Sequence, residues 1–410
     1  MSDSVVIAGA GQAAAQAIVS LRQGGFAGDI VLIGDEPYLP YQRPPLSKMF
    51  LAGEVERERL YLRPEQYYRD QQVELRLSER VESIDAAGRS VRVGGRNLAY
   101  GKLVLATGSA VRRVAIPGAD LPMVHYLRTV DDVIGIQAAF RPGQRLVVVG
   151  GGYIGLEVAA VAVSAGLDVA VVEIADRVMA RVVAPPISRF YLEAHQSAGV
   201  KFHLQAGVTE IRQEPDGSAT VICSGCAPLA ADLIVVGVGV VPVTGIAEAA
   251  GLRCNNGILV DEFCRTSDPH IYAAGDCTNH PNSLIGRRLR LESVHNATEQ
   301  GKTVALDILG QPEAYAQIPW FWSDQYDLKL QMTGLAEQYT DLVLRGDPAT
   351  RSFAAFYFAG EQLLAVHAIN MAREFMLSKK LIARGARLNP AAVADTDTPF
   401  KDLAESAMAG

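Results

Sequence analysis

Two glycine-rich turns in this sequence have the residue types and the spacing that bind the pyrophosphate of a dinucleotide. They are Gly9-x-Gly11-x-x-Ala14 and Gly150-x-Gly152-x-x-Gly155. In such a turn the first glycine permits a tight bend, the second lets the backbone approach the phosphates, and the third position must be small where helix packs on strand. The N–H groups and the positive dipole end of the following helix attract the phosphates.

An acidic residue follows each turn at the end of the next strand-like segment. Asp35 comes directly after residues 29–34, and Glu173 ends residues 168–173. A carboxylate at this position accepts hydrogen bonds from ribose hydroxyls, and this context argues against a glycine turn that binds nothing. Because a carboxylate repels a 2′-phosphate, Glu173 favours NAD over NADP. Arg177, four residues further on, either offsets that preference or is an ordinary surface arginine.

The elements that must position these turns repeat along the chain. Strand-like residues 5–8, a helix to about residue 24 and residues 29–34 form one β-α-β unit, and the pattern returns over residues 145–173. Buried strands are expected at 232–237 and 271–274. After residue 318 the strands alternate as in an antiparallel sheet, and an amphipathic helix follows at about 371–384. We therefore predict an α/β fold with two Rossmann-like dinucleotide-binding domains plus a C-terminal α+β domain.

Composition limits the class of protein. A chain of 410 residues with 49% hydrophobic residues buries a sizeable core in two to three domains. The net charge of −7 argues against a general nucleic-acid binder, which needs excess positive charge. No apolar run is long enough to span a membrane, and strand-like sequence begins where a signal peptide would lie. These features predict a cytoplasmic protein without membrane contact.

Two segments resemble the glutathione-reductase-like flavoproteins. Residues 266–276 (TSDPHIYAAGD) resemble the second flavin motif of that superfamily, in which the aspartate, here Asp276, binds the ribityl chain of FAD. Residues 103–108 resemble the strand that returns to the NAD domain. The resemblance implies an FAD-binding domain over 1–108 and 236–318, an NAD-binding domain over 109–235 and a C-terminal interface domain over 319–410.

Three further segments narrow the resemblance to the putidaredoxin reductase-like ferredoxin reductases of oxygenase systems. They are residues 40–48 (PYQRPPLSK), 290–294 (RLESV) and 319–325 (PWFWSDQ), so the likeness extends over nearly the whole chain. Ala14 stands where that family more often has glycine, so the helix is expected to pack slightly less closely on its strand.

The resemblance implies roles for particular residues. With the turn residues Gly9, Gly11 and Ala14, those expected to bind FAD are Ala13, Asp35, Arg43, Lys48, Val81, Arg128, Asp276, Val294 and Trp320. With the turn residues Gly150, Gly152 and Gly155, those expected to bind NAD are Tyr153, Ile154, Glu157, Glu173 and Gly239. A Lys48–Glu157 pair beside the flavin is the expected catalytic feature. Glu157, placed in the first turn of its helix amid apolar neighbours, needs such a partner.

The cysteines exclude one branch of the superfamily. Disulfide-reducing members carry a redox cysteine pair beside the flavin, whereas the first cysteine here is Cys223. Cys223 and Cys226 form a CxxC that is expected at a hairpin turn, either as a redox or metal pair or as a structural feature. No second CxxC or suitably spaced histidine pair completes a metal site. No metal is therefore predicted.

The sequence favours an FAD-dependent NADH:ferredoxin oxidoreductase. Electrons would pass from NADH through FAD to a [2Fe–2S] ferredoxin that serves an oxygenase, with a haem monooxygenase as the expected terminal enzyme. A rubredoxin or nitrite-type reductase on the same scaffold is one alternative. An interaction protein like apoptosis-inducing factor is another, against which the net charge counts.

Two basic clusters are candidates for docking an acidic ferredoxin. They are Arg287, Arg288 and Arg290, and Lys379, Lys380 and Arg384. Positions 380, 384 and 387 share one helical face if the helix continues to Arg387. Either cluster is alternatively a solvated surface with no partner.

Overall fold

The computed structural model describes residues 4–409, which form two compact units. The first unit contains residues 4–42, 58–110 and 241–319, and the second contains residues 43–57, 111–240 and 320–409. Each unit holds one of the two glycine turns.

The first unit is built on a five-stranded parallel sheet with the order β19-β7-β1-β2-β3. Its strands are β1 (Ser4–Ala8), β2 (Asp29–Gly34), β3 (Val73–Leu77), β7 (Lys102–Leu105) and β19 (Ile271–Ala273). Strands β1 and β7 are buried along almost their whole length, as expected where both faces of a parallel sheet are covered. Helix α1 (Gln12–Gln23) packs against α7 (Val294–Ile308) and contributes small and aliphatic side chains to the core.

Smaller elements complete the first unit. They are α2 (Glu65–Asp70), β4 (Val81–Asp85), β5 (Ser90–Val93), β6 (Arg96–Ala99), α6 (Gly245–Ala249), β18 (Ile258–Leu259), β20 (Thr278–Asn282) and β21 (Arg287–Leu289). Strands β4, β5 and β6 form an antiparallel sheet. The connecting strands β8 (Ser109–Val111) and β17 (Val240–Pro242) pair with each other where the chain passes between units.

The second unit repeats the parallel arrangement with the order β12-β11-β10-β16-β9. Its strands are β9 (Val124–Tyr126), β10 (Arg145–Val149), β11 (Asp168–Glu173), β12 (Lys201–Leu204) and β16 (Leu233–Val236). The helices are α3 (Val130–Ala138), α4 (Tyr153–Ser164) and α5 (Pro185–Ser197). An antiparallel sheet of β13 (Gly207–Gln213), β14 (Ala219–Ser224) and β15 (Leu229–Ala231) follows.

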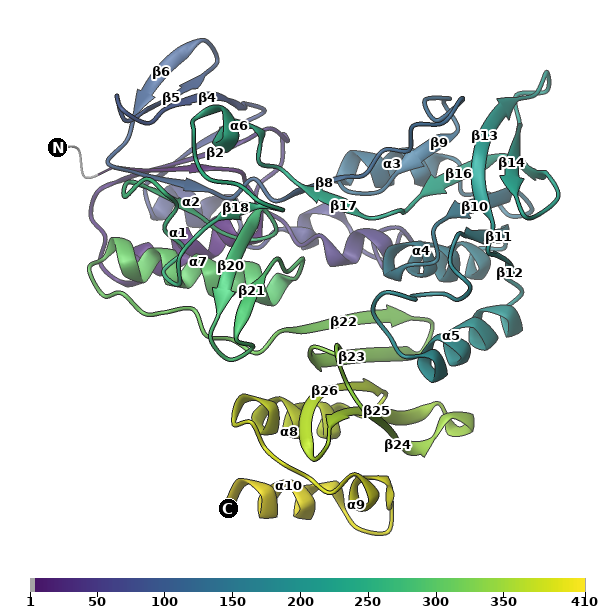
Figure 1. Ribbon diagram of the computed structural model, residues 1–410. Helices are drawn as coiled ribbons and strands as arrows, with labels where there is room; N and C mark the ends of the chain where they lie inside the picture. Colours follow the sequence, from purple (N-terminus) through teal and green to yellow (C-terminus); the bar gives the residue numbers. More distant parts are fainter. Residues whose placement is uncertain (1–3, 410) are drawn as a thin grey trace. The chain divides into compact units, whose positions relative to one another are not determined.

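The C-terminal part of the second unit is a five-stranded antiparallel sheet with the order β22-β23-β26-β25-β24. Its elements are β22 (Trp320–Gln325), β23 (Leu328–Gly334), β24 (Asp341–Asp347), β25 (Ser352–Ala359), β26 (Gln362–Ile369), α8 (Ala372–Ala383), α9 (Pro390–Ala394) and α10 (Phe400–Ala409). Helix α8 packs on β23 and β26 (Figure 1).

The α/β fold class and the antiparallel C-terminal sheet are confirmed. The division into three domains at 108, 235 and 318 stays a prediction. Helix α8 ends at Ala383, with Arg384 as its C-cap, because a left-handed Gly385 follows. The expected helix over about 371–384 is therefore confirmed. The condition for Arg387 to share its face is not met, because Arg387 lies beyond the helix and forms an isolated bridge with Gln362.

Candidate functional site

The glycine turn of the first unit joins β1 to α1. Gly9 has φ +107°, and a Cβ there would lie 2.2 Å from the carbonyl oxygen of Ala106, so only glycine fits. A Cβ at Gly11 would meet no heavy atom within 4 Å, so the space before the helix is open. Within residues 4–409 no side chain caps α1 at Gly11, which leaves the first-turn N–H groups to a ligand.

The turn of the second unit joins β10 to α4 with the same local geometry. Gly150 also has φ +107°, and a Cβ there would lie 2.6 Å from the carbonyl oxygen of Gly237. The space in front of Gly152 is open, and no described side chain caps α4. Both turns therefore have an open cradle of backbone donors, which fits one dinucleotide each.

The other residues of the first unit that are predicted to bind FAD differ in their exposure and in their hydrogen-bond partners. Asp35 is exposed at the end of β2, and its Oδ2 accepts a hydrogen bond from Arg80 at 2.7 Å. Asp276 follows β19 and accepts from the hydroxyl of Ser109 at 2.8 Å. Ala13 and Val81 are each only 5% exposed.

The α7 terminus supplies the remaining first-unit position. Val294 is the first residue of α7, behind the N-cap Ser293, whose hydroxyl accepts from the N–H of Asn296 at 3.1 Å.

In the second unit, the predicted FAD residues Arg43, Lys48, Arg128 and Trp320 are placed by three separate segments. The guanidinium of Arg43 donates to the backbone carbonyl of Arg128 at 2.5 Å, so two of these residues meet. The indole of Trp320, at the start of β22, lies beneath the ammonium of Lys379, which is 5.2 Å from the ring centroid.

Glu157 is the centre of a buried polar cluster. Its side chain is 4% exposed, and Oε2 lies 2.8 Å from the ammonium of Lys48 and accepts from the Ser47 hydroxyl at 2.5 Å. Oε1 accepts from the Ser323 hydroxyl at 2.6 Å. The expected Lys48–Glu157 pair is present, and Ser47 and Ser323 supply the further hydrogen bonds that a buried charge requires.

One detail of the placement of Glu157 was wrong. Helix α4 begins at Tyr153 and has no acidic residue in its first turn, so Glu157 opens the second turn. This places the carboxylate one turn inside the helix, where neighbouring segments cover it.

The other residues predicted for the nicotinamide arm differ in exposure. Ile154 is 40% exposed beside the glycine turn. Tyr153 packs against Phe321, with ring centroids 5.0 Å apart, and its hydroxyl contacts the sulfur of Met332 at 2.9 Å. Burial raises the pKa of Tyr153 far above its ordinary value, so it remains a neutral phenol. Gly239 has φ +103° and its carbonyl accepts from the N–H of Arg112.

Glu173 is tied to the glycine turn. Its carboxylate accepts from the N–H of Gly151 at 2.6 Å and from that of Ala175 at 2.8 Å. Arg177 points elsewhere, because its guanidinium donates to the carbonyls of Val183 and Ala180 at 2.8 and 2.7 Å. Arg177 is thus a partly exposed arginine whose guanidinium is held by its own loop.

Sequence reasoning missed Ser47, Ser323 and Arg80. Ser47 and Ser323 stand within segments already singled out, PYQRPPLSK and PWFWSDQ. Side chains alternate along a strand, so the sequence already places Ser323 and Gln325 on the same face of β22. The structure shows that this face is buried. Nothing in the sequence pairs Arg80 with Asp35.

The CxxC lies where it was expected, at the β14–β15 hairpin of the second unit. Burial, followed by a hydrogen bond to Cys226, raises the pKa of Cys223 to about 12, so its thiol stays protonated at neutral pH. Among residues 4–409 no group of three or more His, Cys, Asp or Glu could hold a metal ion.

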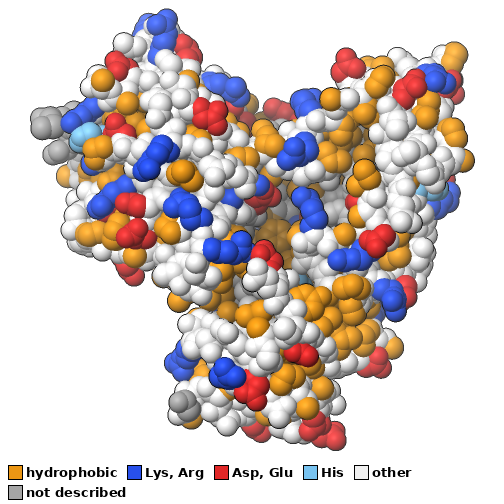
Figure 2. All heavy atoms as spheres, viewed as in Figure 1, with side chains coloured by type: hydrophobic (Ala, Val, Ile, Leu, Met, Phe, Trp, Pro, Cys, Tyr) orange, Lys and Arg blue, Asp and Glu red, His pale blue; other side chains and the backbone are white. Residues whose placement is uncertain are grey.

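The two basic clusters differ in how far their side chains are engaged by neighbouring residues. Arg288 donates to the carbonyls of Asn279 and Val260, and Arg290 pairs with Glu292 at 2.5 Å. Lys380 and Arg384 are exposed in the C-terminal part of the second unit. On the face shown in Figure 2, Lys and Arg side chains are interspersed with Asp and Glu.

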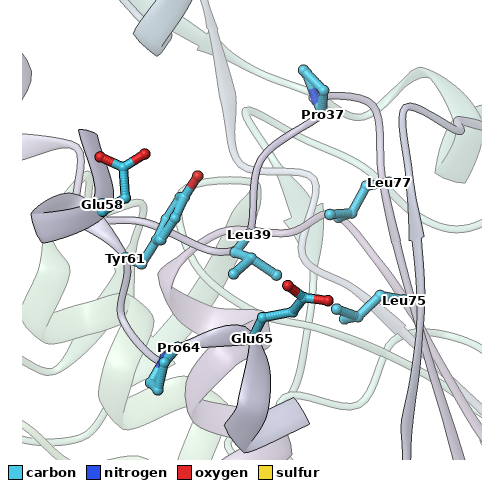
Figure 3. Close-up of a pocket in the computed structure, with 8 residues that line it drawn as sticks. All are labelled: Pro37, Leu39, Glu58, Tyr61, Pro64, Glu65, Leu75 and Leu77. Carbon is cyan, nitrogen blue, oxygen red and sulfur yellow. The ribbon is translucent and has the colours of Figure 1, made fainter. Parts of the chain in front are cut away.

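A cavity of about 780 Å³ in the first unit involves none of the predicted residues. Its lining consists of Pro37, Leu39, Glu58, Tyr61, Pro64, Glu65, Leu75 and Leu77 (Figure 3). Two carboxylates among apolar side chains disfavour a phosphate, so this cavity does not extend the pyrophosphate site. Over the described part of the chain, no helix is long and apolar enough to cross a membrane.

Comparison with known proteins adds to this geometry. The family described as pyridine nucleotide-disulphide oxidoreductase matches residues 3–301, and the family described as reductase C-terminal matches residues 320–404. The 5,5′-dehydrodivanillate O-demethylase ferredoxin reductase subunit of Sphingobium sp. (strain NBRC 103272 / SYK-6) is 42% identical over 401 residues, 97% of each chain.

Two solved structures superpose closely. The covalent putidaredoxin reductase–putidaredoxin complex matches with a TM-score of 0.96 at 39% identity, over 99% of each chain. The ferredoxin reductase for the CYP199A2 system from Rhodopseudomonas palustris matches with a TM-score of 0.95 at 44% identity, over 98% of this chain and 100% of its own.

Proposed function

The chain belongs to the pyridine nucleotide-disulphide oxidoreductase family and is one of its FAD-dependent ferredoxin reductases, and we propose that it carries electrons from NADH to a [2Fe–2S] ferredoxin. The ferredoxin would then serve an oxygenase, and we propose a haem monooxygenase as the terminal enzyme. The neighbour from Rhodopseudomonas palustris is described as part of a CYP199A2 system, which supports this choice.

One observation carries the proposal. The chain has two open glycine cradles but no cysteine before Cys223. Two dinucleotides can therefore bind, while a thiol acceptor in the N-terminal segment is lacking. Electrons that enter from a nicotinamide must leave to an external acceptor.

The residues of this chain supply binding and electrostatics. When bound, FAD provides the redox chemistry, since it accepts two electrons as a hydride and gives them up singly. Glu157 holds the ammonium of Lys48 at a fixed position, and Ser47 shares the same carboxylate oxygen. A fixed positive charge of this kind stabilises negative charge that develops nearby, without reorganisation during the reaction.

The preference for NADH rests on Glu173. Its carboxylate stands at the end of β11, within hydrogen-bond distance of the glycine turn. A 2′-phosphate there would meet this negative charge, and Arg177 is occupied by two backbone carbonyls and offers no compensation. The neighbouring Ile174 is 79% exposed and offers an apolar surface on which an adenine can pack.

The partner is tested by reconstitution. NADH-dependent reduction of cytochrome c is measured while candidate [2Fe–2S] ferredoxins and a rubredoxin are added one at a time. The proposal expects a [2Fe–2S] ferredoxin to raise the rate at least about tenfold above the protein alone. A rubredoxin that couples better than every ferredoxin would contradict it.

The docking face is tested by charge reversal. Exposed Lys380 and Arg287 are each replaced by Glu, and Lys401→Glu on α10 serves as a control with the same change in net charge. If a cluster steers the partner, the KM for ferredoxin rises at low salt and the difference shrinks as salt screens the charges. Reduction of ferricyanide, which needs no docking surface, stays unchanged. Equal ferredoxin KM values for all three variants would reject both clusters.

A further inference from the structure

A chain of buried polar side chains runs from Glu157 to the β22–β23 turn within the second unit. The Ser323 hydroxyl contacts Glu157 Oε1 at 2.6 Å, and the amide nitrogen of Gln325 contacts the Ser323 hydroxyl at 3.1 Å. Gln325 Oε1 lies 2.8 Å from Nε2 of His195, and Nδ1 of His195 lies 2.9 Å from the Tyr326 hydroxyl. The proposed function uses none of the residues beyond Glu157.

These side chains are shielded from water. Ser323 and His195 are 0% exposed and Gln325 is 1% exposed, while Tyr326 is half-buried at the turn. Ser323 and Gln325 come from β22, and His195 comes from α5. The chain therefore joins the C-terminal sheet to the helix α4 that carries Glu157.

The charge of Glu157 determines the direction of every hydrogen bond in this chain. An ionised carboxylate can only accept, so Ser323 must donate its one proton to Oε1. Ser323 must then accept from the NH₂ group of Gln325, which turns the amide oxygen of Gln325 toward His195. His195 therefore carries its proton on Nε2.

The distal end follows from the same logic. Nδ1 of His195 is left with a lone pair and accepts from the Tyr326 hydroxyl. Burial lowers the pKa of His195 to about 4, so the imidazole is neutral at pH 7 and only one of its nitrogens can donate. Five groups thus have one mutually consistent arrangement.

We infer that Ser323, Gln325, His195 and Tyr326 are positioning residues for Glu157, joined in a one-way chain of donors that fixes Oε1 while Oε2 remains with Lys48. The importance of this for hydride transfer rests on the proposed function, in which Glu157 holds Lys48 as a fixed positive charge beside the flavin. Successive hydrogen bonds polarise one another in a low-dielectric interior, so the influence of each link declines with its distance from Glu157.

The arrangement itself is tested by the tautomer of His195. The flavin-loaded protein is labelled with ¹⁵N-histidine, and the His195 signal is identified by its loss in His195→Gln. At pH 7 the proton is expected on Nε2 alone. A proton on Nδ1, or an imidazolium, would overturn the inference whatever the reaction of the protein.

Glu157→Gln gives the sharper outcome. The Lys48 ammonium, a donor only, attracts the amide oxygen, so the new NH₂ group faces Ser323. If Ser323 accepted from both amides, its own buried proton would lack an acceptor, so each bond is expected to reverse. His195 is then expected to move its proton to Nδ1, where it donates to Tyr326. A tautomer that stays on Nε2 in this variant would show that Glu157 does not orient the chain.

A kinetic series tests whether the chain matters for transfer. Reduction of the bound flavin by NADH is expected to slow about tenfold in Ser323→Ala and about twofold in Tyr326→Phe, with KM for NADH little changed. Ser323→Thr, which keeps the hydroxyl, should recover most of the rate.

Matched controls separate positioning from general loss of packing. Ser378→Ala and Tyr191→Phe remove hydroxyls that are equally buried but have no hydrogen-bond partner among residues 4–409. Both should reduce flavin at the wild-type rate. If the controls slow the reaction as much as Ser323→Ala does, the positioning role is rejected. If wild type itself fails to reduce flavin with NADH, the proposed function falls while the tautomer result stands.

Discussion

The two glycine turns have the same backbone conformation at their first glycine but differ in whether they leave room for a side chain. Gly9 and Gly150 share φ +107°, and each lies against the chain leaving a neighbouring parallel strand, near Ala106 and Gly237 respectively. The turns sit in sheets of corresponding strand order. The third position of the motif differs between them. Two turns with the same glycine pattern can therefore differ in whether a side chain fits at that position.

The third position is more crowded in the second turn. A Cβ at Gly155 would lie 2.1 Å from the carbonyl oxygen of Gly150 and 3.2 Å from Val148. Ala14, its counterpart, carries a Cβ and is fully buried in the core. The helix of the second turn therefore approaches its own strand too closely for any side chain, while the first helix leaves room for a methyl group.

The acids after the turns differ as well. Asp35 is exposed and paired with Arg80. Glu173 is half-buried and hydrogen-bonded to backbone N–H groups on both oxygens. The acidic residue after the turn is thus part of an exposed ion pair in the first unit. In the second unit it is hydrogen-bonded to the backbone of the glycine turn.

The largest effect is expected from the third position. Gly155→Ala must push backbone atoms apart, which should cost about 1–3 kcal/mol in the free energy of unfolding and raise the KM for NADH about tenfold or more. Ala14→Gly should cost only about 0.5–1 kcal/mol through added freedom of the unfolded chain. Denaturant unfolding and steady-state kinetics measure both. Equal costs at the two positions would contradict the difference in crowding.

Substitutions of Glu173 and Asp35 should have separate effects, the first on the preference for NADH over NADPH and the second on the affinity for FAD. We expect kcat/KM to favour NADH over NADPH by roughly tenfold to a thousandfold in wild type, and Glu173→Ala to reduce that ratio at least about tenfold. Asp35→Asn, the counterpart, should weaken FAD retention and leave the ratio unchanged. A wild-type ratio near one would mean that Glu173 does not meet the ribose.

Acid should destabilise the second unit more than the first. Burial lowers the pKa of His195 to about 4 and that of His367 to about 3 in the second unit, and that of His280 to about 4 in the first. Each is neutral when folded but takes a proton when unfolded below about pH 6.5, so its stabilisation is full above that pH and declines toward pH 4. At pH 5 the loss is about 2 kcal/mol for each histidine.

Hydrogen exchange at pH 7 and pH 5 can measure this loss by region, after correction for the intrinsic exchange rate. Protection should fall more in α5 and β26, which carry His195 and His367, than in β20, which carries His280. A larger loss of protection in β20 would contradict the prediction.

The smallest effect is expected at the cysteines. Cys223→Ser with Cys226→Ser should leave NADH-dependent ferredoxin reduction within about threefold, because the raised pKa of Cys223 keeps its thiol protonated. Cys264 and Cys277 of the first unit are buried with raised pKa values too. Loss of turnover with the flavin still bound would instead reveal a redox role for the CxxC.

Local patterns predicted much of this molecule. The spacing Gly-x-Gly between a strand and a helix located both turns, because the demand for a positive φ and an open backbone is local to a few residues. Alternation after residue 318 predicted the antiparallel sheet, because one face of each strand is buried. The Lys48–Glu157 pair came from family resemblance rather than from spacing, since 109 positions separate the two residues.

Other features depended on contacts that no local pattern contains. The sequence by itself determined where the glycines stand, which acids follow them and that no cysteine precedes Cys223. Only the tertiary structure decided that Arg177 turns to its own loop and that helix α8 stops before Arg387. It also placed His195 and Ser323 in one chain ending at Glu157. The physical reason is that a buried polar atom must find a partner in space, and the residue that provides it can stand anywhere along the chain.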